Sequence, residues 1–557
     1  MDKKESLSVI KFEPRVGYFS AEIGVSPSIP SYSGGLGVLA GDHVKAAADA
    51  GLPLVGVTLL YREGYMNQHV DAVGKQTEEY PPFNPSWLLE KLDIKVSFHI
   101  NSHTIHLAVW QYWVEGAGGY RVPILFLDSD VPENAPEYRR LCYRLYAGDN
   151  QHRLYQEMAM GLGGMAALRA MGYQKSIQVY HMNEGHTAFL TLDLLKSAGG
   201  NVKQVQQQCV FTTHTPVPAG HDEFSYESAL PALGEYAPEN IRELADNHGK
   251  LSMTHLALNL SRSVNAVSQL HGEVARKMYP QYAVSDVTNG VHHLSWTARE
   301  TQHLFDKQMP GWVQEPVELL KINEVPDDAL WDAHLENKIN LLDYSNAMTQ
   351  KGLSPNLLTI GFARRAATYK RANLLFYDLE RLSEICEGRV QFVFSGKAHP
   401  RDEHGKDVIQ ELYRHIRDLN GRVNVVFLEN YNMWLGRLIT AGVDVWLNTP
   451  LRPNEASGTS GMKAALNGVP SLSVLDGWWN EGCRDGENGW AFGEPAVPSD
   501  RSDANALYRV LAEQVIPTFY DDRPAWLQIM REAIKTGVNF TARRMLDDYT
   551  SKIYQLK

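Results

Sequence analysis

The strongest chemical signal in the sequence is a stretch of small and polar residues that ends in a lysine. Residues 454–463 read NEASGTSGMK and lie between a predicted strand ending at Leu447 and an apolar helix. Unpaired backbone N–H groups and the positive dipole at a helix start can bind a phosphate. The dipole disfavours a lysine there, and an amine destabilised in this way can form a Schiff base. The alternative is that Ser457 caps the helix and Lys463 is solvated, and the spacing does not separate the two.

A second signal is a run of cations, Arg364, Arg365, Lys370 and Arg371, directly after the predicted strand 357–363. In an open α/β sheet ligands bind beyond the carboxyl ends of the strands. The run would therefore concentrate positive potential where a dianionic phosphate could bind. The alternative is a solvated basic face at the start of a helix.

A third signal is the sequence SGGLG at residues 33–37, before a predicted helix over 38–50. Its glycines would permit a close approach of the backbone to a ligand, and the helix start could bind an anion. The motif matches neither GxGxxG nor GxxxxGK[ST], so a simple turn is the better explanation in isolation.

Polar residues also follow two strands predicted in the first half of the chain. The segments are NEGH at 183–186 and THT at 213–215. Side chains at neighbouring strand ends suit hydrogen bonding to sugar hydroxyls. The structural alternative is a capping Glu184 and a buried His214. The histidines lack the HExxH spacing of a zinc site, so we expect no metal.

The last segment of this kind is TNGVHH at 288–293, followed by Trp296. Taken alone, Asn289 and Gly290 predict a turn, and Trp296 predicts a core anchor.

Composition excludes several classes of function. The chain has 557 residues, enough for several domains. Its 65 acidic and 53 basic residues give a formal charge of −12, so nucleic acid is not an expected partner. There is no membrane-spanning run and no signal-peptide pattern, so we expect a cytoplasmic protein. Cys142, Cys209, Cys386 and Cys483 form no CxxC pair, and we expect reduced, structural cysteines.

The elements that must position these residues are typical of α/β domains. In the second half, continuous apolar strands alternate with helices, which predicts a parallel sheet covered on both faces. The strands predicted there are 357–363, 389–395, 423–428, 443–447 and 470–474, and the helices are 372–387, 406–419, 434–441 and 458–466.

The first half has a more mixed order of elements. Strands are predicted at 16–20, 54–60, 96–105, 120–127, 177–182 and 209–213, and helices at 153–171 and 260–278. The periodicity breaks near 297–325, so we expect a first domain over 1–300 and a second over 301–522. Residues 523–557 are predicted to form helices that could cross back to the first domain.

Taken together and in this order, the motifs resemble those of the α-glucan (glycogen/maltodextrin) phosphorylase family. EASGTSGMKAALNG at 455–468 is similar to the family's pyridoxal-phosphate lysine motif, and YKR at 369–371, GKAHP at 396–400 and FLENY at 427–431 also match. The resemblance runs from GGLG near residue 34 to Asp476, in a form shorter than the animal and plant enzymes.

The resemblance implies an α/β fold of two doubly wound, Rossmann-like domains facing a cleft, the glycosyltransferase-B type. It implies a retaining enzyme in which inorganic phosphate attacks the terminal α-1,4 bond of a glucan and releases α-glucose 1-phosphate. It also implies pyridoxal 5′-phosphate as the cofactor, held by Lys463 as a Schiff base, and a homodimer, since the family is often dimeric. We expect no phosphorylation control, because the first predicted strand begins near Val16.

The resemblance assigns three groups of site residues. The catalytic group is Lys463, Arg365, Lys370, His214 and Glu184. The cofactor-binding group is Lys463, Arg364, Thr459, Ser460, Tyr61, Trp296, Tyr431 and Gly34. The substrate-binding group is Gly35, Leu36, His214, Asn289, Tyr369, Glu455, Ala456, Ser457 and Gly458. Cofactor and substrate phosphates repel at close range, and the basic residues would offset that repulsion.

Some positions depart from the pattern of the long enzymes. They are Ser33 for Asn, Glu184 for Asp, Arg364 for Lys, Ser460-Gly461 for Gly-Asn, and residues 366–368 for Ile-His-Glu. They leave chain-length preference and the detailed phosphate geometry undetermined. Two alternative functions also stay open. One is a nucleotide-sugar-dependent glucan synthase on the same fold, which needs no Schiff-base lysine. The other is a catalytically silent glucan-binding protein, which the intact Arg365, Lys370 and Lys463 disfavour.

Overall fold

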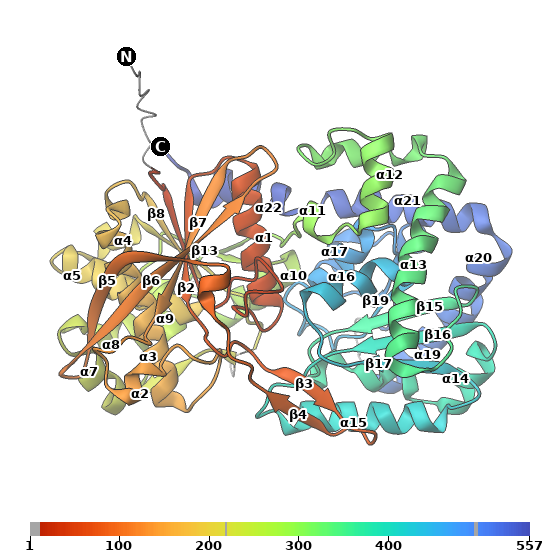
Figure 1. Ribbon diagram of the computed structural model, residues 1–557, viewed down its shortest axis with the longest axis horizontal. Coiled ribbons are helices and arrows are strands. Elements are labelled where there is room, and N and C mark those ends of the chain that lie inside the picture. The colour runs from red at the N-terminus through yellow and green to blue at the C-terminus, as the bar shows by residue number, and fades with distance from the viewer. Residues whose placement is uncertain (1–11, 218–219, 495–498) are drawn as a thin grey trace, which may run out of the picture.

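The computed structural model describes residues 12–217, 220–494 and 499–557, which form two lobes, each built around a β-sheet (Figure 1). The first lobe contains a nine-stranded sheet. In spatial order its strands are β14 (Val284–Asp286), β13 (Ser263–Ala266), β9 (Cys209–Thr212), β8 (Val179–Asn183), β1 (Val16–Ser20), β2 (Leu54–Leu59), β7 (Arg121–Asp128), β6 (His103–Glu115) and β5 (Glu90–Ile100). The strands from β14 to β7 are parallel, and β6 and β5 continue the sheet antiparallel.

The second lobe contains a six-stranded sheet that is parallel throughout. In spatial order its strands are β17 (Asn424–Leu428), β16 (Val390–Ser395), β15 (Leu358–Ala363), β18 (Val445–Asn448), β19 (Ser471–Val474) and β20 (Gly489–Phe492). The strand order reverses between β15 and β18 here, and between β1 and β8 in the first sheet. A ligand crevice opens at the carboxyl ends of the strands at each such switch point.

Both sheets are covered by helices, because alternate strand residues are apolar on opposite faces. Tyr18 packs on one side of the first sheet with α1, and Phe19 packs on the other with α3 and α4. The main helices of the first lobe are α1 (Gly35–Asp49), α3 (Asn150–Met158), α4 (Gly164–Ala170), α5 (Leu190–Ser197), α7 (Tyr226–Leu233), α9 (Met253–Asn259) and α10 (Gln269–Met278). The prediction of two doubly wound α/β domains is confirmed.

The later helices begin with α11 (His293–Trp296), which follows the first sheet. The others are α12 (Arg299–Gln308), α13 (Asp327–Thr349), α14 (Leu379–Cys386), α15 (Glu403–Asp418), α16 (Met433–Gly442), α17 (Thr459–Leu466), α18 (Trp479–Gly482), α19 (Asp500–Val510), α20 (Ile516–Asp521), α21 (Arg523–Val538) and α22 (Ala542–Asp548). In the part of the chain that the structure describes, no helix is both long and apolar enough to cross a membrane.

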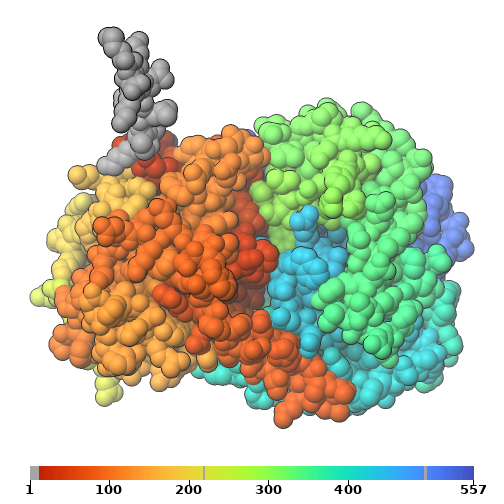
Figure 2. All heavy atoms as spheres, in the orientation of Figure 1, coloured from red at the N-terminus to blue at the C-terminus, as the bar shows by residue number. Residues whose placement is uncertain are grey.

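Besides the direct link of the chain through α11 and α12, two segments of the described residues extend from one lobe to the other. The hairpin of β3 (Asn67–Val70) and β4 (Gln76–Glu79) leaves the first lobe and lies against the second, across the furrow between them (Figures 1 and 2). Gln68 donates to the carbonyl of Gly396 at 2.9 Å, and Gln76 donates to that of Ala398 at 3.0 Å. The hairpin thus contacts the GKAHP segment directly.

The second connection is made by the last helices of the sequence. Helix α21 packs on α17 in the second lobe, whereas α22 and the π-helical turn Tyr549–Tyr554 pack on the first. The Tyr554 hydroxyl lies 2.8 Å from His43 Nε2 and 2.8 Å from His181 Nδ1. Figure 1 shows α22 beside α1. The predicted division at residue 300 falls between β14 and β15.

Several predicted elements need correction. The predicted helix 260–278 contains strand β13 followed by α10, because Ser268 ends the strand and caps the helix by accepting from the His271 N–H. The predicted strand 96–105 spans a hairpin turn at Asn101, whose φ is 53°. Three of the four cysteines are buried, and Cys483 is half-buried.

Candidate functional site

Two buried cations meet one carboxylate at the switch point of the second sheet. Arg364 directly follows β15, Lys370 lies a few residues further on, and Glu455 is in the loop after β18. Glu455 Oε2 lies 2.5 Å from Lys370 Nζ and 2.5 Å from an Arg364 Nη atom. Arg364 also donates to the Asn448 side chain. The alternative of a solvated basic face is wrong for Arg364 and Lys370, since both are buried.

The charge state of Glu455 follows from these contacts. Burial alone would raise its pKa, but Arg364 and Lys370 lower the pKa to about 2. Its backbone N–H donates to Asp476 Oδ2 at 3.0 Å. Burial and the charge of Glu455 raise the pKa of Asp476 to about 7. Glu455 is therefore an anion that the two cations share, which leaves a net positive charge, and Asp476 holds the Glu455 loop.

Lys463 lies inside the protein. It is 5% exposed, and its Nζ lies 3.7 Å from the centroid of the Trp296 ring. Burial lowers the pKa of Lys463 to about 8. The alternative of a solvated lysine is therefore wrong. Burial rather than a helix start accounts for the shift, because Lys463 is the fifth residue of the eight-residue helix α17.

The start of α17 differs from the predicted cap. Gly458 occupies the cap position with φ 83°, and no side chain caps the helix. Ser457, which the alternative named as the cap, is buried and its Oγ has no hydrogen-bond partner among the described residues. Ser460 Oγ accepts from the indole N–H of Trp446 at 3.2 Å, and Thr459 is half-buried beside it. The first-turn amides of α17 therefore remain available to an anion.

The remaining residues of the cationic run lie in different surroundings. Arg371 pairs with Asp503 of α19 at 2.7 Å, so its side chain is held within the second lobe. Arg365 is exposed, and its charge acts on Tyr65 and His399. Tyr369 is half-buried, 4.6 Å from Lys370 Nζ to the ring centroid.

The glycine-rich loop of the first lobe is held by Glu22, which was not predicted as a site residue. Helix α1 begins at Gly35, and Leu36 is half-buried. Glu22 Oε2 accepts from the backbone N–H groups of Ser33 at 2.5 Å and Gly34 at 3.2 Å. A Cβ built on Gly34 or Gly35 would meet nothing within 4 Å, so open space lies before the loop. The only sequence signal for Glu22 is that it follows β1.

Glu184 joins the loops that follow β8 and β9. Its carboxylate accepts from the N–H groups of Gly185 at 2.9 Å and His214 at 2.8 Å, and from the Thr215 hydroxyl at 3.0 Å. This is the capping arrangement named as the alternative. His214 Nε2 lies 2.7 Å from Asn183 Oδ1, and burial lowers the pKa of His214 to about 4. Glu184 therefore positions a neutral His214.

Two buried polar atoms that face no described partner belong to predicted sugar-binding residues. They are Asn289 Oδ1 and Ser457 Oγ. The carbonyl of Asn289 accepts from Arg544, and the carbonyl of Ala456 accepts from Ser268 Oγ at 2.6 Å. Because buried polar atoms are normally paired, these two point to a hydrogen-bonding ligand.

The two tyrosines predicted to bind the cofactor differ in their surroundings. Tyr61 is in the first-lobe core, and its hydroxyl donates to the Ala21 carbonyl at 2.8 Å, behind the Glu22 loop. Tyr431 is half-buried near Arg364, and burial raises its pKa to about 12.

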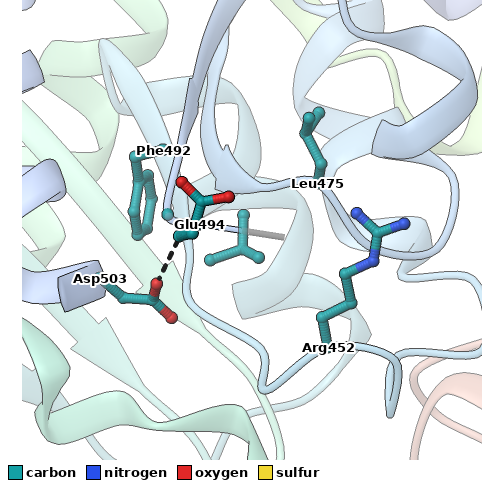
Figure 3. A pocket seen from close by; sticks show the side chains of 7 residues that line it. Arg452, Leu475, Phe492, Glu494 and Asp503 are labelled. Atoms are coloured by element: carbon teal, nitrogen blue, oxygen red, sulfur yellow. Dashed lines mark hydrogen bonds between the residues drawn. The ribbon is translucent and has the colours of Figure 1, made fainter. Parts of the chain in front are cut away.

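A small cavity behind the Glu455 loop is separate from these residues. It is lined by Arg452, Leu475, Phe492, Glu494 and Asp503, among others (Figure 3). Its volume of about 10 Å³ is room for no more than one water. Within the described ranges, no three His, Cys, Asp or Glu side chains are grouped so as to hold a metal ion.

The residues around Lys463 fit pyridoxal phosphate. A buried amine with a lowered pKa can react with an aldehyde, and an aromatic face lies 3.7 Å from it. The uncapped start of α17 lies one turn before Lys463 and can hold the cofactor phosphate.

Comparison with known proteins adds independent information. Residues 231–494 match the carbohydrate phosphorylase family, and residues 16–284 match the starch synthase catalytic domain. The chain is 39% identical over 98% of its length to the maltodextrin phosphorylase of Thermococcus litoralis, of which it covers 71%. It is 37% identical over 97% of its length to a glycogen phosphorylase of Mycobacterium tuberculosis, covering 70%, and 35% identical over 98% to that of Aquifex aeolicus, covering 86%.

Proposed function

We propose a function from the premise that this chain belongs to the carbohydrate phosphorylase family. The enzyme is an α-glucan phosphorylase. Inorganic phosphate attacks the anomeric carbon of the terminal glucose, and the bond to the glycosidic oxygen breaks. That oxygen takes a proton, and α-glucose 1-phosphate leaves with retained configuration.

The observation that carries the residue assignments is that Arg364, Lys370 and Glu455 meet at one switch point, while the buried Lys463 lies on α17, the helix that follows the Glu455 loop. Lys463 would hold pyridoxal 5′-phosphate through its side-chain nitrogen, Trp296 would contribute an aromatic side chain to the site, and Arg364, Thr459 and Ser460 would bind the cofactor phosphate. When bound, the cofactor supplies a phosphate group that exchanges a proton with the substrate phosphate.

The substrate phosphate binds to Lys370 and Arg365 and to the Gly35 N–H. Lys370 donates to Glu455 in this structure, so phosphate binding replaces one anion with another. Arg365 is exposed and can turn toward an incoming phosphate. The Glu22 carboxylate keeps the loop amides in place during this exchange.

The terminal glucose binds between the lobes. Ser457 Oγ and Asn289 Oδ1 have no hydrogen-bond partner among the residues that the structure describes, and each can bind a sugar hydroxyl. His214 is neutral and held by Asn183 and Glu184, so it can hydrogen-bond to another hydroxyl. Glu455 binds a hydroxyl with the oxygen that the cations leave free.

The direct test is phosphate-dependent release of glucose 1-phosphate from maltodextrin, with a phosphate-free control. Product that forms only with phosphate supports the proposal. Lys463→Ala is expected to lose bound cofactor and activity, and Lys535→Ala, which changes a half-buried lysine of α21 that pairs with Glu532, serves as the control. Cofactor absorbance retained by Lys463→Ala after dialysis contradicts the assignment.

A nucleotide-sugar-dependent glucan synthase is the second candidate, favoured by the starch synthase match over residues 16–284. It predicts folded protein without pyridoxal phosphate and glucan extension from a nucleotide sugar. The 39% identity to a maltodextrin phosphorylase favours the first candidate.

A further inference from the structure

A buried carboxylate to which the proposed reaction gives no role lies near Lys463. Asp42 belongs to α1 in the first lobe and is fully buried. Its Oδ2 accepts a hydrogen bond of 2.8 Å from the indole Nε1 of Trp296. Lys463 Nζ lies over that same indole ring. Asp42 therefore reaches the surroundings of the lysine from the opposite lobe.

The second oxygen of Asp42 is unusual. Oδ1 is buried and has no hydrogen-bond partner among the described residues. An unpaired carboxylate oxygen is strongly unfavourable inside a protein unless positive charge lies close by. A group that served only to hold Trp296 would need one acceptor atom and no charge.

Several other charged groups lie around this position, and Asp42 also acts on one of them, because its charge opposes the lowering of the Lys45 pKa by burial. On α1, Lys45 donates to Ser295 Oγ at 2.8 Å, and Asp49 pairs with His292 of the adjoining loop at 2.7 Å. Arg437 on α16 is half-buried. Burial lowers the pKa of Lys463, the charge of Asp42 opposes that shift, and the charge of Lys45 adds to it.

We infer that Asp42 is a positioning residue for Lys463. Its Oδ2 fixes the Trp296 ring against the lysine side chain, and its Oδ1 supplies the negative charge that stabilises positive charge on the lysine nitrogen. This inference rests on the proposed role of Lys463 as the cofactor lysine, although the interaction of the two charges can be measured without the cofactor.

Asp42→Asn separates the two functions of the carboxylate. The amide oxygen still accepts from Trp296, while the negative charge is lost. Asp49→Asn is the matched control, because it removes a carboxylate from the same helix that pairs elsewhere. Trp296→Phe is the complementary variant, since it keeps the aromatic ring and the Asp42 charge but removes the N–H donor.

The first measurement is the absorbance of the purified full chain. If the pyridoxal chromophore is present, its absorbance is titrated against pH in the wild type and the three variants. If it is absent, the proposed function fails, and the same titration is made by acetylating the free Lys463 and quantifying its peptide by mass spectrometry. A failure of the proposed function is thereby distinguished from a failure of the inference about Asp42.

We expect Asp42→Asn to lower the apparent pKa of the Lys463 nitrogen by about one unit, a roughly tenfold change in the protonation equilibrium. Asp49→Asn is expected to titrate like the wild type, and Trp296→Phe to keep a pKa at least as high. An unchanged pKa in Asp42→Asn overturns the inference. So does an equal decrease in Asp49→Asn or Trp296→Phe. If Asp42→Asn does not fold, a wild-type pKa in Trp296→Phe supports the charge effect, and a lowered one overturns it.

Discussion

Lys370 and Glu455 show how the proposed phosphate site is held in place when no phosphate is bound. A single carboxylate oxygen lies 2.5 Å from both Lys370 and Arg364, so the cations are already positioned and partly neutralised. The pKa of Glu455 is lowered to about 2 from its usual 4.5. The stabilisation from this group is therefore full above pH 4.5 and is lost as the pH falls towards 2.

Lys370→Ala tests the phosphate role at this scale. A charge-assisted hydrogen bond contributes about 1.5–3 kcal/mol, so we expect the KM for phosphate to rise roughly 10- to 100-fold. The KM for maltodextrin should change much less. Initial rates at varied concentrations of each substrate measure both values.

Arg371→Ala is the control for Lys370→Ala. It removes the neighbouring cation, which pairs with Asp503 rather than with Glu455. We expect it to lower stability without a selective effect on phosphate. Equal effects of the two variants on the KM for phosphate would argue against the assignment of Lys370.

At the scale of elements, a buried ion network attaches α13 to the second sheet. Lys338 Nζ lies 2.6 Å from Asp444 Oδ2, and His334 Nε2 lies 2.9 Å from Asp444 Oδ1. The Asp444 carboxylate also accepts from the backbone N–H of Thr359, the second residue of β15. The network therefore fixes the strand that presents Arg364.

Lys338→Met is expected to destabilise the protein by about 3–5 kcal/mol, because it leaves a buried carboxylate without its strongest partner. Denaturant unfolding followed by fluorescence measures the change. Lys351→Met is the control, since Lys351 is an exposed residue just beyond α13. A decrease in the free energy of unfolding of less than 1 kcal/mol in Lys338→Met would mean that the ion network contributes little to stability.

The sequence predicts elements best where apolar strands are continuous. The strands β15, β16, β17, β18 and β19 lie within two residues of their predicted starts, because both faces of each are buried. Strand β20 was not predicted, since its sequence GWAF is only four residues long. It also begins at Gly489, whose φ of 149° no hydrophobic pattern in the sequence indicates. The helix predicted over 260–278 failed because Ser-Val-Asn-Ala reads equally as helix or strand.

The site divides in a similar way. The sequence predicts site residues that follow strand ends, such as Arg364 and Glu455, because the topology of a parallel sheet brings those strand ends together. Glu22, Asp42 and the β3–β4 hairpin were not predicted. Their partners are separated from them by tens to hundreds of residues, and no local pattern marks such contacts.

At the scale of the whole molecule, the β3–β4 hairpin bridges the two lobes. Gln68 and Gln76 together bond to Gly396, Ala398 and Asn430. We expect the double variant Gln68→Ala/Gln76→Ala to raise the KM for glucan and for phosphate together, since both bind between the lobes. Each lost hydrogen bond also costs about 1 kcal/mol of stability.

The control for this double variant is His69→Ala, which changes an exposed residue of the same hairpin. Substrate kinetics and small-angle X-ray scattering measure affinity and lobe separation. Unchanged scattering and kinetics in the double variant would show that the lobes are held by other contacts.

Buried histidines make the whole fold sensitive to acid. Burial lowers the pKa of His43 to about 3, and those of His214, His271 and His293 to about 4, from 6.5. These groups are neutral when folded, so stability is full above pH 6.5 and falls below it. For each of these histidines, the free energy of unfolding falls by about 1.4 kcal/mol per pH unit below 6.5, until the pKa of the folded state is reached.

The measurement is the free energy of unfolding between neutral pH and pH 5. His43→Gln is expected to make the free energy of unfolding depend less steeply on pH, because it removes one buried neutral histidine. Substitution of the exposed His69 should leave this dependence unchanged. A stability that does not change over this range would exclude neutral buried histidines.

The position of Tyr554 bears on how the protein is made. Its hydroxyl contacts His43 and His181 in the first lobe, and its carbonyl accepts from Arg262 at 2.6 Å. A growing chain leaves the ribosome in sequence order, so the whole second lobe is synthesised before these side chains are available. The core of the first lobe therefore stays partly uncovered while the second lobe is synthesised, until Tyr554 becomes available.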